Sequence, residues 1–225
     1  MSTPALAMNC DTLAPFYGIL EHLSFGPFLE RARFHYLPHL SHARRALLCG
    51  DGDGRFLERL LQHNPTVEID FVDLSGKMIE LAARRASNLG PAFRNRVRFH
   101  HCDVRDFSPA KPAHYDLIVA HFFLDCFGST EVSFVVRLLS HWAAPSAQCI
   151  VSEFREIPAP PARYISRAIV RSLYAAFRLT TNLRTTQLPD YPAALRAHSF
   201  RLQQESFLLH GLLHSSLWSF EGLEG

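Results

Sequence analysis

The sequence predicts a three-layer α/β sandwich built on a doubly wound, mostly parallel seven-stranded sheet that ends in a C-terminal antiparallel hairpin. Beyond residue 40, short apolar runs alternate with helix-like stretches, a pattern typical of βαβ units and a parallel sheet. Right-handed crossovers then place helices on both faces. Two further strand-like runs, residues 200–208 and 212–220, are separated only by a short turn, which favours the hairpin.

Five strands and three helices are expected before the hairpin. The expected strands are Ala46–Cys49, Ile69–Leu74, Val97–His101, Leu117–Phe123 and Cys149–Phe154, and the expected helices are Arg55–Gln62, Gly76–Ser87 and Thr130–Trp142. The residues before the sheet are rich in aromatic side chains and resemble two helices. A chain of 225 residues is long enough to form one such domain with a well-buried core.

Composition indicates an ordinary globular protein. The formal net charge is +2, so the whole chain offers no electrostatic argument for binding nucleic acid or a membrane surface. Five cysteines without a C-x-x-C pair indicate free thiols in a reducing compartment. The N-terminus lacks the pattern of a signal peptide and no run is long enough to span a membrane, so we expect a cytoplasmic protein.

A glycine-rich turn follows the first expected strand and leads directly into a helix. Gly50, Gly52 and Gly54 alternate with other residues there. Glycine adopts positive φ and allows a ligand to approach the backbone closely, and the first helical turn offers unpaired N–H donors. A dinucleotide site of the G-x-G-x-x-G type would need a third glycine at position 55, which is Arg55. The spacing therefore favours a different nucleotide-like ligand.

Acidic residues follow the next strands along the chain. Asp73 ends the second expected strand, about twenty residues after the turn, where it is placed to accept hydrogen bonds from ribose hydroxyls. Asp103 closes the third expected strand, and His121 and Asp125 come at the end of the fourth. Ligands of open α/β sheets bind at the carboxyl ends of the strands. These residues are therefore expected at one crevice.

Together, the G-x-G-x-G turn, the run Asp73-Leu74-Ser75-Gly76-Lys77-Met78 and the pair Asp103-Val104 resemble class I S-adenosylmethionine (SAM) methyltransferases of the ubiquinone/menaquinone-biosynthesis type. The resemblance implies a Rossmann-like fold, SAM as methyl donor and S-adenosylhomocysteine (SAH) as product. It also implies a helical lid over residues 1–42, with Phe16, Tyr17 and Tyr36 capping the site, and a SAM-binding domain over residues 43–225. The cofactor-binding residues that it implies are Gly50, Asp51, Gly52, Gly54, Asp73, Leu74, Met78, Asp103, Val104 and His121.

One position departs from the family pattern. Such methyltransferases usually carry an acidic residue two positions before the first glycine of the turn, and Leu48 stands there. Asp51 and Asp53, inside the turn, are the candidates for the missing negative charge near the sulfonium.

The sequence after the fourth strand bears on the methyl acceptor. DNA-adenine and protein-glutamine methyltransferases carry Asn/Asp-Pro-Pro-Tyr there, whereas this chain has His121-Phe122-Phe123-Leu124. That difference favours a small apolar or aromatic acceptor and no nucleic-acid partner. His121 is the candidate base, because its pKa is ordinarily near neutral, and Asp125 is a candidate to orient it or to contact SAM.

Eight arginines between positions 155 and 201 oppose only two acidic residues. Arg163, Arg167 and Arg171 share one face of an expected helix, for which a solvated polar face is the simpler interpretation. The alternative is a surface for an acidic partner or an anionic substrate. The thirteen histidines form no recognisable set of metal ligands, so no metal is predicted.

Two rival functions stay open from the sequence alone. The first is a catalytically silent SAM-binding protein of the same fold, which Leu48 keeps in play. The second is a nicotinamide-dependent reductase, against which Arg55 and the terminal hairpin argue.

Overall fold

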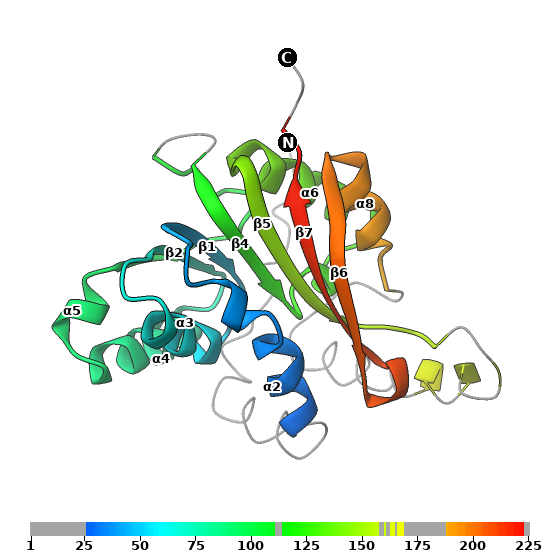
Figure 1. Cartoon of the computed structure of the whole chain (residues 1–225), viewed down its shortest axis with the longest axis horizontal. Helices are drawn as coiled ribbons and strands as arrows, with labels where there is room; N and C mark the ends of the chain where they lie inside the picture. Colours follow the sequence, from blue (N-terminus) through cyan, green and yellow to red (C-terminus); the bar gives the residue numbers. More distant parts are fainter. Residues whose placement is uncertain are drawn as a thin grey trace, which may run out of the picture.

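A seven-stranded sheet in the order β3-β2-β1-β4-β5-β7-β6 forms the centre of the protein (Figure 1). The computed structural model describes residues 26–110, 114–157, 160, 163–164, 166–168 and 188–222. Strands β1 to β5 are parallel, whereas β7 pairs antiparallel with both β5 and β6. The predicted fold class and its C-terminal hairpin are therefore confirmed.

The strands are β1 (Arg45–Cys49), β2 (Glu68–Asp73), β3 (Val97–His101), β4 (Tyr115–His121), β5 (Ala143–Phe154), β6 (Phe200–Leu208) and β7 (Leu213–Phe220). The helices are α2 (Gly26–Phe34), α3 (Arg55–His63), α4 (Gly76–Asn88), α5 (Pro91–Arg94), α6 (Ser129–Trp142) and α8 (Tyr191–Ala197). Short 3-10 turns lie at η1 (Leu37–His39), η2 (Leu124–Cys126) and η3 (Leu209–Gly211). Within the described ranges, no helix is long and apolar enough to cross a membrane.

The strands send successive side chains into two apolar layers, one on each face of the sheet. Leu47 of β1 packs in the layer that contains Val135 and Leu139 of α6, while its neighbour Leu48 packs in the layer that contains Phe56 of α3. Strands buried on both faces read as continuous apolar runs, which is why the sequence pattern located them. α3 and α4 lie side by side at the end of the molecule away from β6 (Figure 1).

The bounds of β4 and β5 differ from the predicted ones. β4 ends at His121 rather than residue 123, because the backbone turns at Phe122 (φ +53°), outside the extended region. β5 begins at Ala143, six residues before the predicted start, and its register against β4 is irregular. β3 has the predicted bounds, Val97–His101, but Asp103, which was expected to close it, lies in the turn after the strand.

Part of the predicted N-terminal lid lies within the described residues. α2 carries its carboxyl-terminal half onto the sheet, where the Ala32 carbonyl accepts hydrogen bonds from the hydroxyls of Ser152 and Ser215 (3.1 Å each). Tyr36 is buried beside Leu48 rather than exposed at the crevice. Phe16 and Tyr17 lie outside the described residues, as does Arg171, so the lid stays a prediction.

A carboxylate inside the sheet ties three strands together. Asp70 lies in the middle of β2 and accepts hydrogen bonds from Arg98 Nε (2.9 Å), His100 Nε2 (2.7 Å) and the Tyr115 hydroxyl (3.0 Å). Burial alone would raise the pKa of Asp70, but the hydrogen bonds from His100, Arg98 and Tyr115 outweigh it and hold this pKa well below its usual range. The ionised carboxylate therefore stabilises the fold.

We expect Asp70→Asn to lower the free energy of unfolding by about 2–3 kcal/mol at pH 7, because it removes the charged acceptor of the bonds from Arg98 Nε, His100 Nε2 and the Tyr115 hydroxyl. The lowered pKa means that this stabilisation is present above the ordinary carboxyl pKa of about 4 and is lost as the pH falls below it. Urea unfolding of both proteins between pH 3 and 7 should therefore show the difference shrinking toward acid. The exposed Asp106→Asn serves as control, and a pH-independent difference would contradict the assignment.

Candidate active site

The glycine turn joins β1 to α3 with a backbone that only glycine adopts readily. Gly50, Gly52 and Gly54 have φ of +63°, +63° and +80°. A Cβ added at Gly54 would lie 2.7 Å from Ala82 Cα, so this glycine also lets α3 approach α4. A Cβ added at Gly50 would lie 2.3 Å from Cδ2 of Phe123, whose ring packs against the turn. The turn is therefore confined on both sides.

The two aspartates of the turn have different environments. Asp53 Oδ2 accepts from Arg85 Nη2 (2.8 Å) and Arg55 Nε (3.1 Å), so its charge is neutralised while it ties the turn to α4. Asp51 is buried, and its Oδ2 accepts the Leu57 N–H of α3 (2.9 Å). Its Oδ1 has no hydrogen-bond partner among the described residues.

Burial raises the pKa of Asp51 to about 7, against an opposing effect of the Arg33 guanidinium. Small changes in charge near this carboxyl will therefore change its ionisation at neutral pH. A cation placed close to it would favour the carboxylate.

The carboxyl end of β2 leads into α4 through a capped turn. Asp73, half-buried, accepts the Ser75 N–H at Oδ1 (2.8 Å), and Ser75 Oγ accepts the Met78 N–H (3.2 Å). The Leu74 carbonyl lies 3.0 Å from Nε2 of His101, at the end of the neighbouring β3. Asp73 thus has a structural role as well as the ribose-binding role that the sequence predicts.

Asp103 follows β3, and both of its oxygens are held by one arginine. Arg105 reaches Oδ1 through Nε (2.9 Å) and Oδ2 through Nη2 (2.6 Å). Burial would raise the pKa of Asp103, but the hydrogen bonds from Arg105 outweigh it and lower this pKa. Val104 is buried beside it. An adenine amino group would therefore meet a carboxylate that stays ionised.

His121 ends β4 inside the protein. The residue is only 2% exposed, and its Nδ1 lies 3.0 Å from Ser152 Oγ. Its ring packs edge to face on the Phe56 ring, with 4.7 Å between the ring centroids. Burial lowers the pKa of His121 well below its usual range, helped by the charge of Arg33. The imidazole is thus neutral, but its burial weighs against a role as base.

The turn after β4 is fixed by a buried carboxyl group. Glu153 Oε1 accepts the N–H groups of Phe123 (3.1 Å) and Leu124 (2.7 Å), immediately after the strained Phe122. Burial raises the pKa of Glu153 well above its usual range, and the neighbouring carboxyl of Asp125 raises it further. Both groups are buried, so two ionised carboxylates would repel each other here and a shared proton would relieve that repulsion.

A second group of hydrogen-bonded side chains joins Tyr191 to the surface. The Tyr191 hydroxyl, whose pKa is raised by burial and by Glu153, donates to Nδ1 of His214 (2.7 Å), and Nε2 of His214 donates to Glu205 (3.1 Å). Burial lowers the pKa of His214, although Glu205 opposes that shift. These contacts fix the orientation of the His214 ring.

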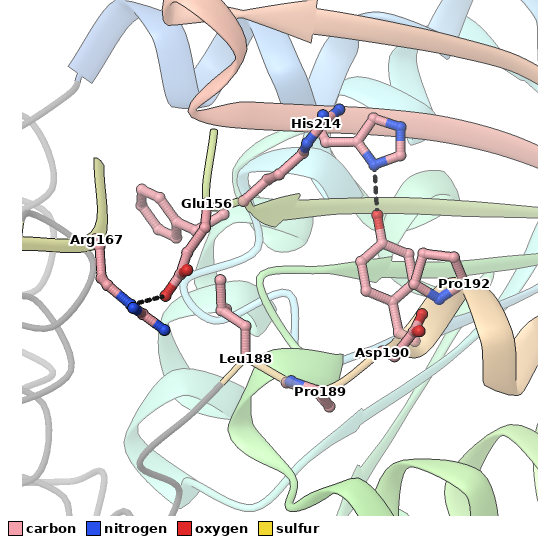
Figure 2. Close-up of a pocket in the computed structure, with 10 residues that line it drawn as sticks. Glu156, Arg167, Leu188, Pro189, Asp190, Pro192 and His214 are labelled. Carbon is pink, nitrogen blue, oxygen red and sulfur yellow. Dashed lines mark hydrogen bonds and ion pairs between the residues drawn. The ribbon is translucent and has the colours of Figure 1, made fainter. Parts of the chain in front are cut away.

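Tyr191 and His214 line a hollow of about 370 Å³ beside the end of β5. Figure 2 shows it between the His214 side chain, the Leu188–Pro192 segment and an ion pair of Arg167 with Glu156 (3.3 Å). This volume falls within the range of small-molecule pockets. The hollow is lined by Phe154, Arg155, Glu156, Arg167, Leu188, Pro189, Asp190, Tyr191, Pro192 and His214.

Sequence reasoning did not single out Glu153, Tyr191 or His214 as site residues. Glu153 stands in an apolar strand, a signal that could have marked it, since a buried acid needs a partner. The partners of Tyr191 and His214 come from separate elements that only the fold brings together. Among the described residues, no group of three or more His, Cys, Asp or Glu side chains is placed to hold a metal.

Comparison with known protein families adds to this geometry. Residues 47–149, from β1 into β5, match the family model described as "Methyltransferase domain". The polyamine aminopropyltransferase 2 of Bacillus anthracis is 35% identical over 83 residues, which are 35% of this chain and 23% of that protein. The chain thus spans less than a quarter of the length of that relative.

Solved structures share the fold at low sequence identity. The N-methyltransferase NodS from Bradyrhizobium japonicum, in complex with SAH, has a TM-score of 0.62 and 16% identity, covering 86% of this chain and 88% of that one. An O-methyltransferase family protein from Burkholderia thailandensis has a TM-score of 0.71 and 16% identity, and the match covers 94% of this chain and 60% of that one. The chain therefore shares its fold with these two methyltransferases.

We expect Gly54→Ala to destabilise the protein by about 2–4 kcal/mol, since it adds backbone strain at positive φ to a clash with the α4 backbone. Gly222→Ala is a matched control, because Gly222 has φ +79° but nothing within 4 Å of an added Cβ. It should cost only about 1–2 kcal/mol. If thermal or urea unfolding shows the same loss of stability for Gly54→Ala and Gly222→Ala, the close packing of Gly54 on Ala82 is unimportant.

Proposed function

We propose that this protein is a SAM-dependent methyltransferase that binds SAM across the carboxyl ends of β1, β2 and β3. The observation that carries this proposal is the turn Gly50–Gly54, whose three glycines have positive φ, with Asp73 and Asp103 after the neighbouring strands. The family match over residues 47–149 spans the same stretch and supports it.

The residues present fit the adenosine part of SAM. Asp73 would accept the ribose hydroxyls, with Leu74 and Met78 beside it. Asp103 would accept the adenine amino group, and the Val104 N–H would face a ring nitrogen. The Arg105 pair keeps Asp103 ionised, which favours acceptance of an amino hydrogen bond.

Asp51 is the proposed counter-charge for the sulfonium. The position at which the family usually carries an acidic residue is Leu48, which is buried in the apolar layer beneath α3. Asp53 is neutralised by Arg85 and Arg55. Asp51 keeps an oxygen without a hydrogen-bond partner among the described residues, and a cation beside this buried carboxyl would stabilise its ionised form.

SAM supplies a methyl group already activated on a sulfonium, so the protein's task is to align the acceptor and to manage one proton. We propose a small apolar or aromatic acceptor, since aromatic side chains surround the end of β4: Phe122, Phe123, Phe127 and Phe154. Asp125, in the carboxyl pair with Glu153, is one candidate to manage that proton. His121 stays the second candidate.

A catalytically silent SAM-binding protein is the main alternative, and the absence of an acid at Leu48 favours it. A nicotinamide-dependent reductase is less well supported, because the third glycine of the dinucleotide pattern is missing at Arg55.

SAH at about a hundred times its dissociation constant should stabilise the protein by about 2.7 kcal/mol and raise its melting temperature, whereas NADH should not. Asp73→Ala should remove most of that shift, because ribose contacts are lost. Glu80→Ala on the exposed face of α4 should keep it. A shift with NADH alone would favour the reductase, and no shift with either ligand would contradict SAM binding.

Asp51→Asn should weaken SAM about tenfold more than SAH, because only SAM carries the sulfonium charge and tenfold corresponds to about 1.4 kcal/mol. Because the pKa of Asp51 is about 7, the preference of the unmodified protein for SAM over SAH should grow as the pH rises from 6 to 8. Asp51→Asn should flatten that profile. If Asp51→Asn loses the same affinity for SAM and for SAH at every pH, Asp51 is not the counter-charge of the sulfonium.

A further inference from the structure

The hollow beside the end of β5 is placed to receive the methyl acceptor. It begins at Phe154, the last residue of β5, and is bounded by Tyr191 and His214. β5 runs parallel to β4 and β1, so its carboxyl end lies on the same edge of the sheet as the glycine turn, two strands along. The hollow is therefore on the edge at which SAM is proposed to bind, and this inference rests on that proposed function.

The carboxylates around the hollow are already engaged. Glu156 pairs with Arg167 (3.3 Å), Asp190 accepts the Ala193 N–H (3.0 Å), and Glu205 accepts from His214 (3.1 Å). Glu153 is hydrogen-bonded to Asp125. Each acidic group thus has a donor, and none is placed to balance a further cation.

Arg155 is that further cation. Its guanidinium lies over the Phe207 ring, 4.6 Å from the centroid, and no described carboxylate lies within ion-pair distance of it. Its positive charge reaches the other polar groups of the hollow, because it lowers the pKa of both Tyr191 and His214. A guanidinium stacked on a ring keeps its in-plane N–H donors directed outward, ready for a carboxylate.

The remaining walls are apolar. Phe154, Leu188, Pro189 and Pro192 line the hollow, with Leu188 and Pro189 on the side away from His214 in Figure 2. These apolar side chains, with the Tyr191 ring, make up about half of the lining, and charged or polar side chains make up the rest. The lining thus suits an apolar or aromatic body, and the unbalanced arginine suits an anionic group at one end of it.

We propose that the hollow binds the acceptor as a small apolar or aromatic carboxylic acid, whose carboxylate pairs with Arg155 and whose body packs on Phe154 and Pro192.

The test compares 4-hydroxybenzoate with its neutral analogue 4-hydroxybenzamide by calorimetric titration of the protein saturated with SAH. The acid should bind at least tenfold more tightly than the amide, and Arg155→Gln should abolish that preference. Arg196→Gln is the matched control, because Arg196 also lies over a ring, that of Trp218 at 5.5 Å, but outside the hollow. It should keep the preference.

Equal binding of acid and amide, no binding of the acid, or a preference that survives Arg155→Gln would overturn the inference. Titration with SAH alone distinguishes failure of the acceptor-site inference from failure of the proposed SAM binding. If SAH binds normally and the acid does not, only the acceptor site is wrong. If SAH binds neither the unmodified protein nor the Arg155→Gln and Arg196→Gln variants, the methyltransferase proposal itself fails.

Discussion

The buried carboxyl group of Glu153 fixes the turn on which both halves of the candidate site depend. It accepts the N–H groups of Phe123 and Leu124, immediately after a residue with strained φ. That turn presses the Phe123 ring onto Gly50, on the side of the proposed cofactor, and carries Asp125 toward Tyr191, on the side of the hollow. Without an internal acceptor these N–H groups would be unsatisfied, at a cost of about 1–3 kcal/mol each.

The acidic residues at the carboxyl edge combine structural and binding roles. Asp51 caps α3, Asp73 orders the turn that leads into α4, and Asp103 is clamped by Arg105. Such second contacts fix each carboxylate in position before a ligand arrives, so little side-chain entropy is lost on binding. The same contacts explain why a capping role and a ligand-binding role are not exclusive at these positions.

The sequence predicted what local pattern and chain order determine. Continuous apolar strands revealed the parallel sheet, and the alternating glycines revealed the turn at Gly50–Gly54. The rest needed the tertiary structure. The end of β4 depends on the φ of Phe122, which no propensity predicts for a β-forming residue. The roles of Asp70 and Glu153 depend on hydrogen-bond partners that are distant in the sequence. The role of Arg155 depends on having no carboxylate partner among the described residues. A sequence pattern carries neither kind of information.

A crystal structure of the protein with SAH tests the central claim most directly. We expect SAH across the carboxyl ends of β1 to β3, with its ribose hydroxyls on Asp73, its adenine amino group on Asp103 and its backbone contacts along the glycine turn. The thioether sulfur should face the Phe123 turn and open toward the hollow beside Tyr191. SAH bound elsewhere, or a sulfur directed away from that hollow, would contradict it.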